Sequence, residues 1–322
     1  MSDIKTVAVV PTYKARETIL TVVSKLGPYV DHVLLVDDGC PEGSGELVSR
    51  EFAESEKITV LEREVNGGVG AAMKTGFDWA LSNEFDIIIK VDADDQMDVE
   101  HIPGMIAALT KGEADFVKGN RFDSVQDIEK MPLTRVFGNA VLSLVSKVST
   151  GLWTVNDPTN GFLAITRPAL QAVQHKKLSD GFFFESDLLF RLGLSSCRVQ
   201  EITMPSIYGD EKSNLRISRV IFSFPFLHLR NFLKRIVYAY FVREWSLGTL
   251  NLIGSSVMFV IALFLTIDAL RVIESTGNPI TAGQAVGISM TGILGFQLVL
   301  GFLSYDVQMQ RRGKARFSLS SK

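Results

Sequence analysis

The sequence Ile87-Ile88-Ile89-Lys90-Val91-Asp92-Ala93-Asp94-Asp95-Gln96 passes from an apolar run straight into three carboxylates. Short, nearly continuous apolar runs of this kind are typical of strands that are buried on both faces of a parallel sheet. Like charges so close together repel each other, so the acids need a cation among them or full solvation by water. The segment therefore predicts a buried strand whose carboxyl end carries charge that must be compensated.

The same pattern recurs along the first two thirds of the chain, where short β-rich runs alternate with helical stretches. The runs lie at residues 7–10, 32–36, 58–61, 87–91, 116–117, 162–166 and 199–204. Helical patterns lie between several of them, as at 17–26, 45–54 and 70–81. Strand followed by helix, repeated, predicts an α/β fold with a Rossmann-like, mainly parallel sheet and helices on both faces.

Polar and glycine-rich residues follow four of the predicted strands. They are Pro11-Thr12-Tyr13, Asp37-Asp38-Gly39, Asn66-Gly67-Gly68-Val69-Gly70 and the acidic residues at 92–96. Because ligands of open α/β sheets bind beyond the carboxyl ends of the strands, these four ends predict one binding cleft. The glycines follow the third strand and do not form a dinucleotide fingerprint, which argues against a Rossmann dehydrogenase.

The charge of the chain is unevenly distributed. A net charge of -3 gives no reason to expect a nucleic-acid partner, but residues 212–243 hold seven Lys or Arg and residues 308–322 hold five, with no acid in either segment. Between them lie two apolar runs, 247–270 and 285–307, each near the ~20 residues that a helix needs to cross a bilayer. The predicted domains are a head at 1–210, juxtamembrane helices at 211–245, a two-helix transmembrane hairpin at 246–307 and a basic tail at 308–322.

Flanking charge predicts the orientation of this hairpin. Basic residues crowd its two outer ends, whereas the intervening loop carries Arg271 against Glu274. By the positive-inside tendency, we expect the head and the tail in the cytoplasm, at the inner membrane of the cell. The amino terminus has a short apolar run and lacks the longer core of a signal peptide. Cys40 and Cys197 suit a reducing compartment.

The segment 215–241 has an amphipathic helical pattern. Its apolar stripe consists of Phe222, Phe226, Leu229, Leu233, Ile236 and Tyr240. Arg219, Arg230 and Lys234 fall off that stripe, and we expect Pro225 to separate two helices. Helices that are apolar on one side and cationic on the other fit the interface of an anionic membrane. Packing of the stripe on the core of the head is the alternative.

The acidic segment itself suits a divalent cation. Asp92 and Asp94 place oxygen ligands at alternate positions after a buried strand. Mg2+ and Mn2+ prefer such ligands and take phosphate oxygens and waters as well. A bound ion would settle the repulsion between the acids, and a solvated acidic turn is the alternative. Asp37-Asp38 ends the neighbouring strand, where a carboxylate can accept hydrogen bonds from a base or a ribose.

Taken in order, the motifs resemble the glycosyltransferase family 2 enzymes, and among them the polyprenyl-phosphate glycosyltransferases related to dolichol-phosphate mannose synthase. The matching pieces are residues 9–13, 36–39, 66–72, 91–94, Gly119-Asn120-Arg121-Phe122 and Asn156-Asp157-Pro158-Thr159-Asn160-Gly161-Phe162. The two membrane spans resemble the bacterial branch that glycosylates undecaprenyl phosphate. The resemblance implies a GT-A-type fold, a nucleotide-diphosphate sugar donor, Mg2+ or Mn2+, and a polyprenyl phosphate acceptor.

The resemblance also implies roles for residues on the donor side. Carried over by position, the donor nucleotide contacts are Pro11, Tyr13, Asp37, Asp38, Gly68, Gly70 and Asp92, and the metal ligands are Asp92, Asp94 and Gln96. The glycines would let the backbone approach the nucleotide. We expect Asp95 to point away from the ion, because successive side chains of an extended chain face opposite sides.

On the acceptor side, Arg121 and Arg135 match arginines that hold the lipid phosphate, and surface ion pairs are the alternative. Lys212 and Arg216, with Arg219, would capture that phosphate or attract anionic headgroups. Asp157 would act as a base or orient the sugar or acceptor. Glu185 and Asp187 resemble an acidic pair near the sugar, and a helix start is the alternative.

Two departures from the family pattern bear on the donor. Lys14-Ala15 replaces the usual Asn-Glu after the first motif, so a carboxylate for the base is absent; we therefore favour UDP over a guanine nucleotide. Leu163 stands where many relatives carry an arginine shortly after the Gly-Phe position. The expected reaction is a single, inverting displacement, with Asp94 and Arg121 central to it, that moves one hexose such as glucose and leaves it β-linked to the lipid phosphate.

Two other functions are alternatives to this transfer. A processive polysaccharide synthase needs a long channel and usually a Gln-x-x-Arg-Trp motif, which this sequence lacks. A scaffold without catalysis is disfavoured by the intact Asp92, Asp94, Gln96 and Arg121. Two spans per subunit could also pack with neighbours, so a homo-oligomer is an open expectation.

Overall fold

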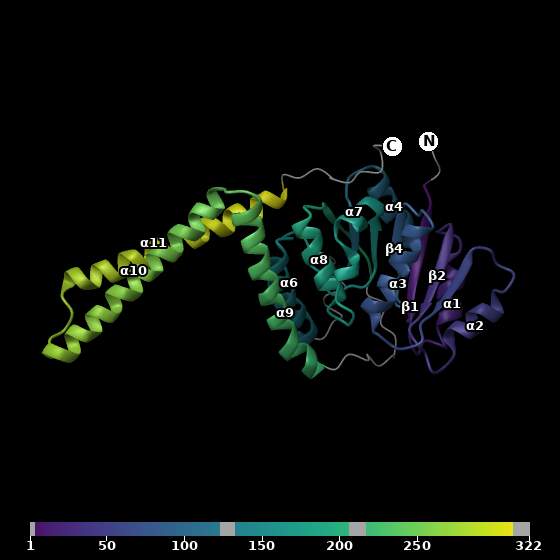
Figure 1. The fold of residues 1–322 in the computed structure, drawn as a ribbon, viewed down its shortest axis with the longest axis horizontal. Coiled ribbons are helices and arrows are strands. Elements are labelled where there is room, and N and C mark those ends of the chain that lie inside the picture. Colours follow the sequence, from purple (N-terminus) through teal and green to yellow (C-terminus); the bar gives the residue numbers. More distant parts are fainter. Residues whose placement is uncertain (1–3, 123–132, 206–216, 312–322) are drawn as a thin grey trace. The chain divides into compact units, whose positions relative to one another are not determined.

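The computed structural model describes residues 4–122, 133–205 and 217–311 (Figure 1). The described chain divides into two compact units, and the division falls inside helix α9 (Ile217–Val237), between Leu233 and Lys234. The boundary that we predicted at residue 210 lies outside the described residues.

The first unit is built on a mixed sheet of seven strands in its described part. In spatial order they are β3 (Ile58–Glu62), β2 (His32–Asp37), β1 (Thr6–Thr12), β4 (Ile87–Lys90), β6 (Leu163–Thr166), β5 (Phe116–Asn120) and β7 (Val199–Thr203). Neighbouring strands are parallel except at β6, which runs antiparallel to both β4 and β5. The expected α/β fold with a mainly parallel sheet is confirmed.

Helices cover both faces of this sheet. They are α1 (Ile19–Leu26), α2 (Ser44–Glu51), α3 (Val69–Ser82), α4 (Ile102–Thr110), α7 (Arg167–Ala172) and α8 (Phe184–Leu194), and α6 (Leu133–Thr150) packs on α8. Successive residues of a strand point to opposite faces, so β1 divides its apolar side chains between two cores. Val7 and Val9 join one core, and Ala8 and Val10 join the other. This double burial explains why the strands read as unbroken apolar runs.

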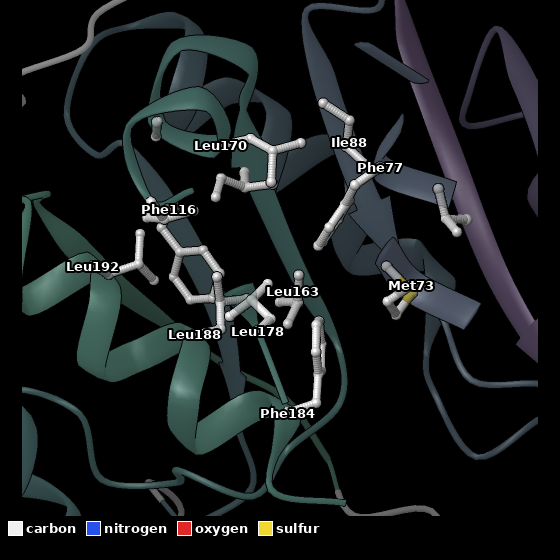
Figure 2. Close-up of a cluster of buried hydrophobic side chains, with 14 of the residues drawn as sticks. Met73, Phe77, Ile88, Phe116, Leu163, Leu170, Leu178, Phe184, Leu188 and Leu192 are labelled. Atoms are coloured by element: carbon white, nitrogen blue, oxygen red, sulfur yellow. The ribbon is translucent and has the colours of Figure 1, made fainter. Parts of the chain in front are cut away.

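The first of these cores contains several large aromatic side chains. Phe77 of α3, Phe116 of β5 and Phe184 of α8 are fully buried there, with Leu163 of β6 and Leu188 of α8 (Figure 2). Burying a side chain of this size contributes about 1.5–3 kcal/mol. The core therefore fastens α3 and α8 to the same side of the sheet, on either side of β6.

Helix α9 corrects one expectation. Pro225 lies inside a continuous helix and does not separate two. Proline removes one backbone hydrogen bond, but packing of the helix can outweigh that loss. His228 and Asn231, in the turns that follow, are buried, and the His228 ring meets Phe183 edge-on. These contacts hold the helix together across the proline.

The second unit contains two long helices, α10 (Leu247–Thr276) and α11 (Ala282–Arg311). Both are long and apolar enough to cross a membrane, and both extend beyond the apolar runs that we predicted. A buried cluster joins them to the end of α9. Arg235 donates to Asp306 at 2.6 and 3.2 Å, and the Tyr240 hydroxyl donates to Asp306 at 2.5 Å. Tyr240 is thus a buried hydrogen-bond donor in the π-helical turn Tyr238–Arg243 (η3), not part of an apolar stripe.

Two glycines of the first unit offer a matched test of this packing. A Cβ at Gly70 would overlap the carbonyl oxygen of Ser179, whereas a Cβ at Gly104, an exposed position of α4, would lie 3.8 Å from the nearest side chain, Ile202. Gly70→Ala should lower the free energy of unfolding by about 1–3 kcal/mol, because backbone has to move. Gly104→Ala should leave it unchanged or raise it by up to about 1 kcal/mol, since alanine favours helix.

Urea denaturation of the full chain, followed by tryptophan fluorescence, gives both values. Equal effects of the two substitutions would contradict the close approach at Gly70.

Candidate active site

The polar motifs meet at one edge of the sheet. Strands β1, β2, β4 and β5 are parallel in direction and end at Thr12, Asp37, Lys90 and Asn120. Because β6 runs the other way, the segment 156–162 that leads into it reaches the same edge from the opposite direction. The reversal of one strand therefore brings a motif that precedes a strand beside motifs that follow strands.

Asp37 and Asp38 organise the loops on the donor side of this edge. Asp37 accepts the backbone N–H groups of Cys40 and Gly45, each at 2.7 Å. Asp38 accepts the N–H of Gly68 at 2.7 Å and forms an ion pair with Arg63. Both carboxylates are buried. The structure brings the predicted nucleotide residues Asp38 and Gly68 into direct contact, and their role toward a nucleotide stays a prediction.

The glycine-rich segment lies close to the chain itself. Gly68 has a φ of +91°, and a Cβ there would press against the carbonyl of Asp180. Next to Gly70, the N–H of Ala71 donates to the same carbonyl at 3.0 Å. The glycines therefore let α3 begin against the backbone at 179–181, a requirement that the sequence pattern alone did not show.

Lysines from two elements compensate the acidic segment. Asp92 forms an ion pair with Lys90 of β4, and Asp95 forms one with Lys25 of α1 at 2.7 Å. Asp94 accepts the backbone N–H of Gln96 at 3.1 Å. Asp95 has a φ of 57°, so the segment is a turn. The extended geometry from which we predicted the direction of Asp95 is therefore wrong, although its side chain does bind a different element from that of Asp92.

Lys90 is the centre of this arrangement. Its side chain is 1% exposed, and besides Asp92 its ammonium group contacts the Gly161 carbonyl at 3.2 Å and Glu185 at 3.3 Å. Burial by itself lowers the pKa of Lys90, but Asp92 and Glu185 outweigh it and the pKa is raised. A Cβ at Gly161 would overlap the Asp92 carboxylate, so a larger residue here would have to displace that carboxylate. Lys90 was visible in the apolar run, but the sequence did not indicate its role.

The residues present fit a divalent cation that shares its coordination with a substrate. Within the described residues, no group of three or more His, Cys, Asp or Glu could hold a metal ion. Mg2+ usually takes one or two carboxylates and completes its shell with phosphate oxygens and waters. Lysines pair with Asp92 and Asp95. The predicted metal ligands Asp92, Asp94 and Gln96 lie together in this turn, and their role toward an ion stays a prediction. The donor set does not suit an ion held by protein alone.

Arg121 and Asp157 form the second constellation of the site. Arg121 Nε donates to Asp157 at 2.8 Å and its Nη2 donates to the other carboxylate oxygen at 3.0 Å. Asp157 is fully buried, while the Arg121 side chain is 25% exposed. Two parallel bonds of this kind fix the plane of a guanidinium group. Asp157 therefore orients Arg121 and leaves part of it facing out.

Glu201 of β7 supports this pair and was missed in the sequence. Its carboxylate accepts the backbone N–H groups of Asn156 and Asp157 at 2.8 and 2.9 Å, and the Asn120 amide at 2.9 Å. Burial raises its pKa, although hydrogen bonds from Asp157 and Asn156 oppose that effect. An acid inside a predicted strand was the available signal.

Lys118 of β5 is a second buried lysine at the edge. Lys90 and Lys118 both lie opposite Leu163 of β6, one on each side, so they share a face of the sheet. Lys118 donates to the Asn160 carbonyl. Burial lowers its pKa to about 8, against the opposing effect of Asp157 and Glu185.

The remaining predicted residues differ in where they lie. Glu185 faces Lys90, but Asp187 turns to the N–H of Ser179 at 3.0 Å, so the structure separates this acidic pair. Pro11 lies in β1, and the Tyr13 side chain just beyond it is 39% exposed. Lys212, Arg216 and the side chain of Arg135 lie outside the described residues.

Two helices of this unit have inverted polarity. On α6 the exposed side chains include Leu133, Phe137, Val141 and Leu144, whereas Ser143, Ser146 and Ser149 are buried. On α9 the exposed side chains include Phe226, Leu229 and Leu233, whereas His228 and Asn231 are buried. The buried faces meet where Ser149 hydrogen-bonds His228 at 2.8 Å. Apolar stripes that face outward mark a surface that binds something apolar.

Comparisons with known proteins agree on the head. The family model described as "Glycosyl transferase family 2" matches residues 7–173. Polyprenol monophosphomannose synthase of Mycolicibacterium smegmatis is 30% identical over 58% of this chain and 71% of its own. Undecaprenyl-phosphate mannosyltransferase of Micrococcus luteus is 29% identical over 62% of this chain and 82% of its own length. UDP-N-acetylglucosamine--dolichyl-phosphate N-acetylglucosaminyltransferase of Methanococcus voltae is 26% identical over 70% of this chain and 94% of its own length.

The lowered pKa of Lys118 predicts a pH dependence of stability. Between its folded pKa of about 8 and an unfolded value near 10.4, the unfolded chain holds a proton that the folded chain lacks. Wild-type stability should therefore rise with pH relative to Lys118→Met, by about 2–3 kcal/mol between pH 7 and pH 10.

Urea denaturation of both proteins across this range measures the difference. Lys111→Met is the control, because Lys111 is exposed at the end of α4 and its difference from wild type should stay flat. If the difference in free energy of unfolding between wild type and Lys118→Met stayed constant across this pH range, that would contradict the buried environment of Lys118.

Proposed function

The chain belongs to glycosyl transferase family 2, and we propose that it moves one hexose from a nucleotide-diphosphate sugar to a polyprenyl phosphate at the membrane surface. One observation carries the proposal. A cation-compensated acidic turn and an oriented arginine lie at the same edge of the sheet, at Asp92–Gln96 and at Arg121. The first suits a diphosphate with its metal ion, and the second suits a phosphate acceptor.

On the donor side, Asp94 and Gln96 would hold Mg2+ or Mn2+. Such an ion, when bound, neutralises the negative charge that develops on a departing diphosphate. Lys90 keeps Asp92 and Glu185 in place, and we assign Glu185 to the neighbourhood of the sugar. Two of the relatives are named for mannose, and the third is named for UDP-N-acetylglucosamine. Mannose, glucose and N-acetylglucosamine are therefore the donors to compare, with UDP and guanine carriers for each.

On the acceptor side, Arg121 binds the lipid phosphate. A phosphate monoester has a second pKa of about 6, so its attacking oxygen is largely ionised at neutral pH and needs no strong base. This supports Asp157 as a positioning residue, because its carboxylate is occupied by the guanidinium group of Arg121. Placing the two substrates supplies much of the catalysis.

The bond changes follow from this placement. The phosphate oxygen of the lipid attacks the anomeric carbon, the bond from that carbon to the diphosphate oxygen breaks, and the nucleoside diphosphate leaves with the electron pair. A single displacement inverts an α-linked donor to a β-linked product. An α-linked product would exclude the one-step reaction.

The outward apolar stripes of α6 and α9 support a membrane-bound acceptor. A lipid phosphate presents its headgroup at the interface, where amphipathic helices bind. We propose that these two stripes rest on the membrane, that α10 and α11 cross it, and that the head lies on the cytoplasmic side. Arg235 is buried against Asp306, but the other six basic residues at 212–243, with no acid among them in the sequence, favour contact with anionic lipid.

Asp94 and Asp95 provide a matched pair of variants. Asp94→Asn should lower kcat by about 100-fold or more, because it removes the carboxylate that would hold the ion against the departing diphosphate. Asp95→Asn makes the same chemical change one residue later, removes an ion pair with Lys25 and should stay close to wild type. Asparagine also tolerates the positive φ of this position.

The assay follows transfer of labelled sugar to undecaprenyl phosphate by the full chain in vesicles, with and without a chelator. Equal rates for the two variants would contradict the assignment of Asp94. A labelled polymer in place of a singly glycosylated lipid would indicate the processive alternative.

Variants of Arg121 and Arg63 distinguish binding of the acceptor from binding of the donor. Arg121→Lys keeps the charge but loses the paired hydrogen bonds, so kcat/KM for the lipid phosphate should fall by about 10- to 100-fold while KM for the donor stays constant. Arg63→Lys makes the same change beside Asp38 and should raise KM for the donor instead. Steady-state kinetics with each substrate varied give both patterns. A change in donor KM alone for Arg121→Lys would contradict its role.

A further inference from the structure

Helix α11 presents a second seam on the side away from α10. Its inner side packs on α10, where Gly295 lies close to Met258 and Phe259. Two residues further on, about 200° around the helix, Gln297 is exposed. The exposed positions on this outer side recur at alternating spacings of four and three residues: Val286, Met290, Ile293, Gln297, Leu300 and Ser304. That spacing is the repeat of a coiled-coil seam.

The outer side of α10 differs in one respect. Its exposed positions have the same alternating spacing but are apolar throughout: Leu250, Ile253, Val257, Val260, Phe264 and Ile267. A face of this kind suits lipid chains. The seam of α11 instead has the Gln297 amide at its centre. Lipid chains can cover the apolar face of α10, but they cannot form hydrogen bonds with this amide.

Gln297 lies near the middle of α11, roughly 22 Å from each end of the helix. In a bilayer whose hydrocarbon core is about 30 Å thick, this depth has no water to bind an amide. Among the described residues, no hydrogen-bond partner is found for the Gln297 side chain. Polar side chains at such depth usually face another protein surface.

We propose that α11 packs against α11 of a second copy of this chain, with the two Gln297 amides hydrogen-bonded to each other. This inference relies on the proposed function for the placement of the hairpin in a membrane. All copies insert in the same orientation, so their Gln297 residues lie at the same depth. A carboxamide carries both donor and acceptor, and its partial charges therefore complement those of its twin. The contact is parallel and self-complementary, as a two-fold dimer requires.

Gln297 also fixes how the two seams align. A polar residue within an otherwise apolar seam specifies register, because any shift leaves its hydrogen bonds unmade. Val286, Met290, Ile293 and Leu300 would supply the apolar contacts on either side of it. The paired chains would then carry two heads in the same orientation at one membrane surface.

The test measures self-association of full-length chains that carry donor and acceptor fluorophores at the amino terminus, in phospholipid vesicles at a series of protein-to-lipid ratios. Wild type should show energy transfer that rises with density. Gln297→Leu should weaken association by about tenfold or more, and Gln297→Asn, which keeps an amide, should largely retain it. Ser256→Ala on α10 is the control, because the Ser256 hydroxyl already donates to its own helix at Leu252.

Equal association of wild type and Gln297→Leu would overturn the proposal, as would wild-type chains that remain monomeric in the vesicles. Alkaline extraction of the same vesicles separates the two levels of inference. A chain that is washed off contradicts the membrane placement as well, whereas an inserted, active and monomeric chain overturns the pairing of α11 alone. Cross-linking of Gln297 to a different protein in native membranes, with no contact between copies, would also overturn it.

Discussion

The buried ammonium group of Lys90 is the interaction on which the site depends. It lies at the carboxyl end of β4 and binds Asp92, Glu185 and the Gly161 carbonyl, which come from three separate parts of the chain. A buried charge is tolerable when it is paired and hydrogen-bonded. Removing one member of the pair would leave the other charge buried without compensation, which destabilises the fold. Lys90 thereby links the acidic turn, the start of β6 and helix α8. With Lys25 on Asp95, it compensates two of the three acids of this turn.

A second network holds the acceptor side by the same principle. Glu201 accepts the backbone of Asn156 and Asp157, and Asp157 in turn holds the guanidinium group of Arg121. Glu201 positions Asp157, and Asp157 positions Arg121. The partly exposed guanidinium group of Arg121 therefore has a fixed direction. The two networks flank β6, whose reversed direction brings residues 156–162 to the edge where the other strands end. Mixed strand direction is thus a requirement of the site.

Much of the fold could be predicted from the sequence, because double burial leaves apolar runs that mark each strand. All seven predicted strands are present, and α1, α2 and α3 lie close to their predicted ranges. The direction of β6 could not be predicted, since an apolar run reads alike in both directions. The turn at Asp95 and the continuous helix through Pro225 depend on tertiary contacts. The motif acids and Arg121 lie at one edge of the sheet as expected, and their roles stay predictions. Lys90 and Glu201 could not be predicted, because their partners include residues distant in sequence. The stripe on α6 was missed because apolar residues also occupy other sides of this helix.

The central claim is that the acidic turn supplies one carboxylate to an ion that the donor's diphosphate must complete. Binding of Mn2+ to the purified full chain, followed by electron paramagnetic resonance with and without UDP, tests it most directly. The account predicts weak binding of Mn2+ alone and much tighter binding when UDP is present, with the gain lost when Asp94 is replaced by asparagine. Tight binding of Mn2+ without a nucleotide, or a gain from UDP that survives that replacement, would contradict it.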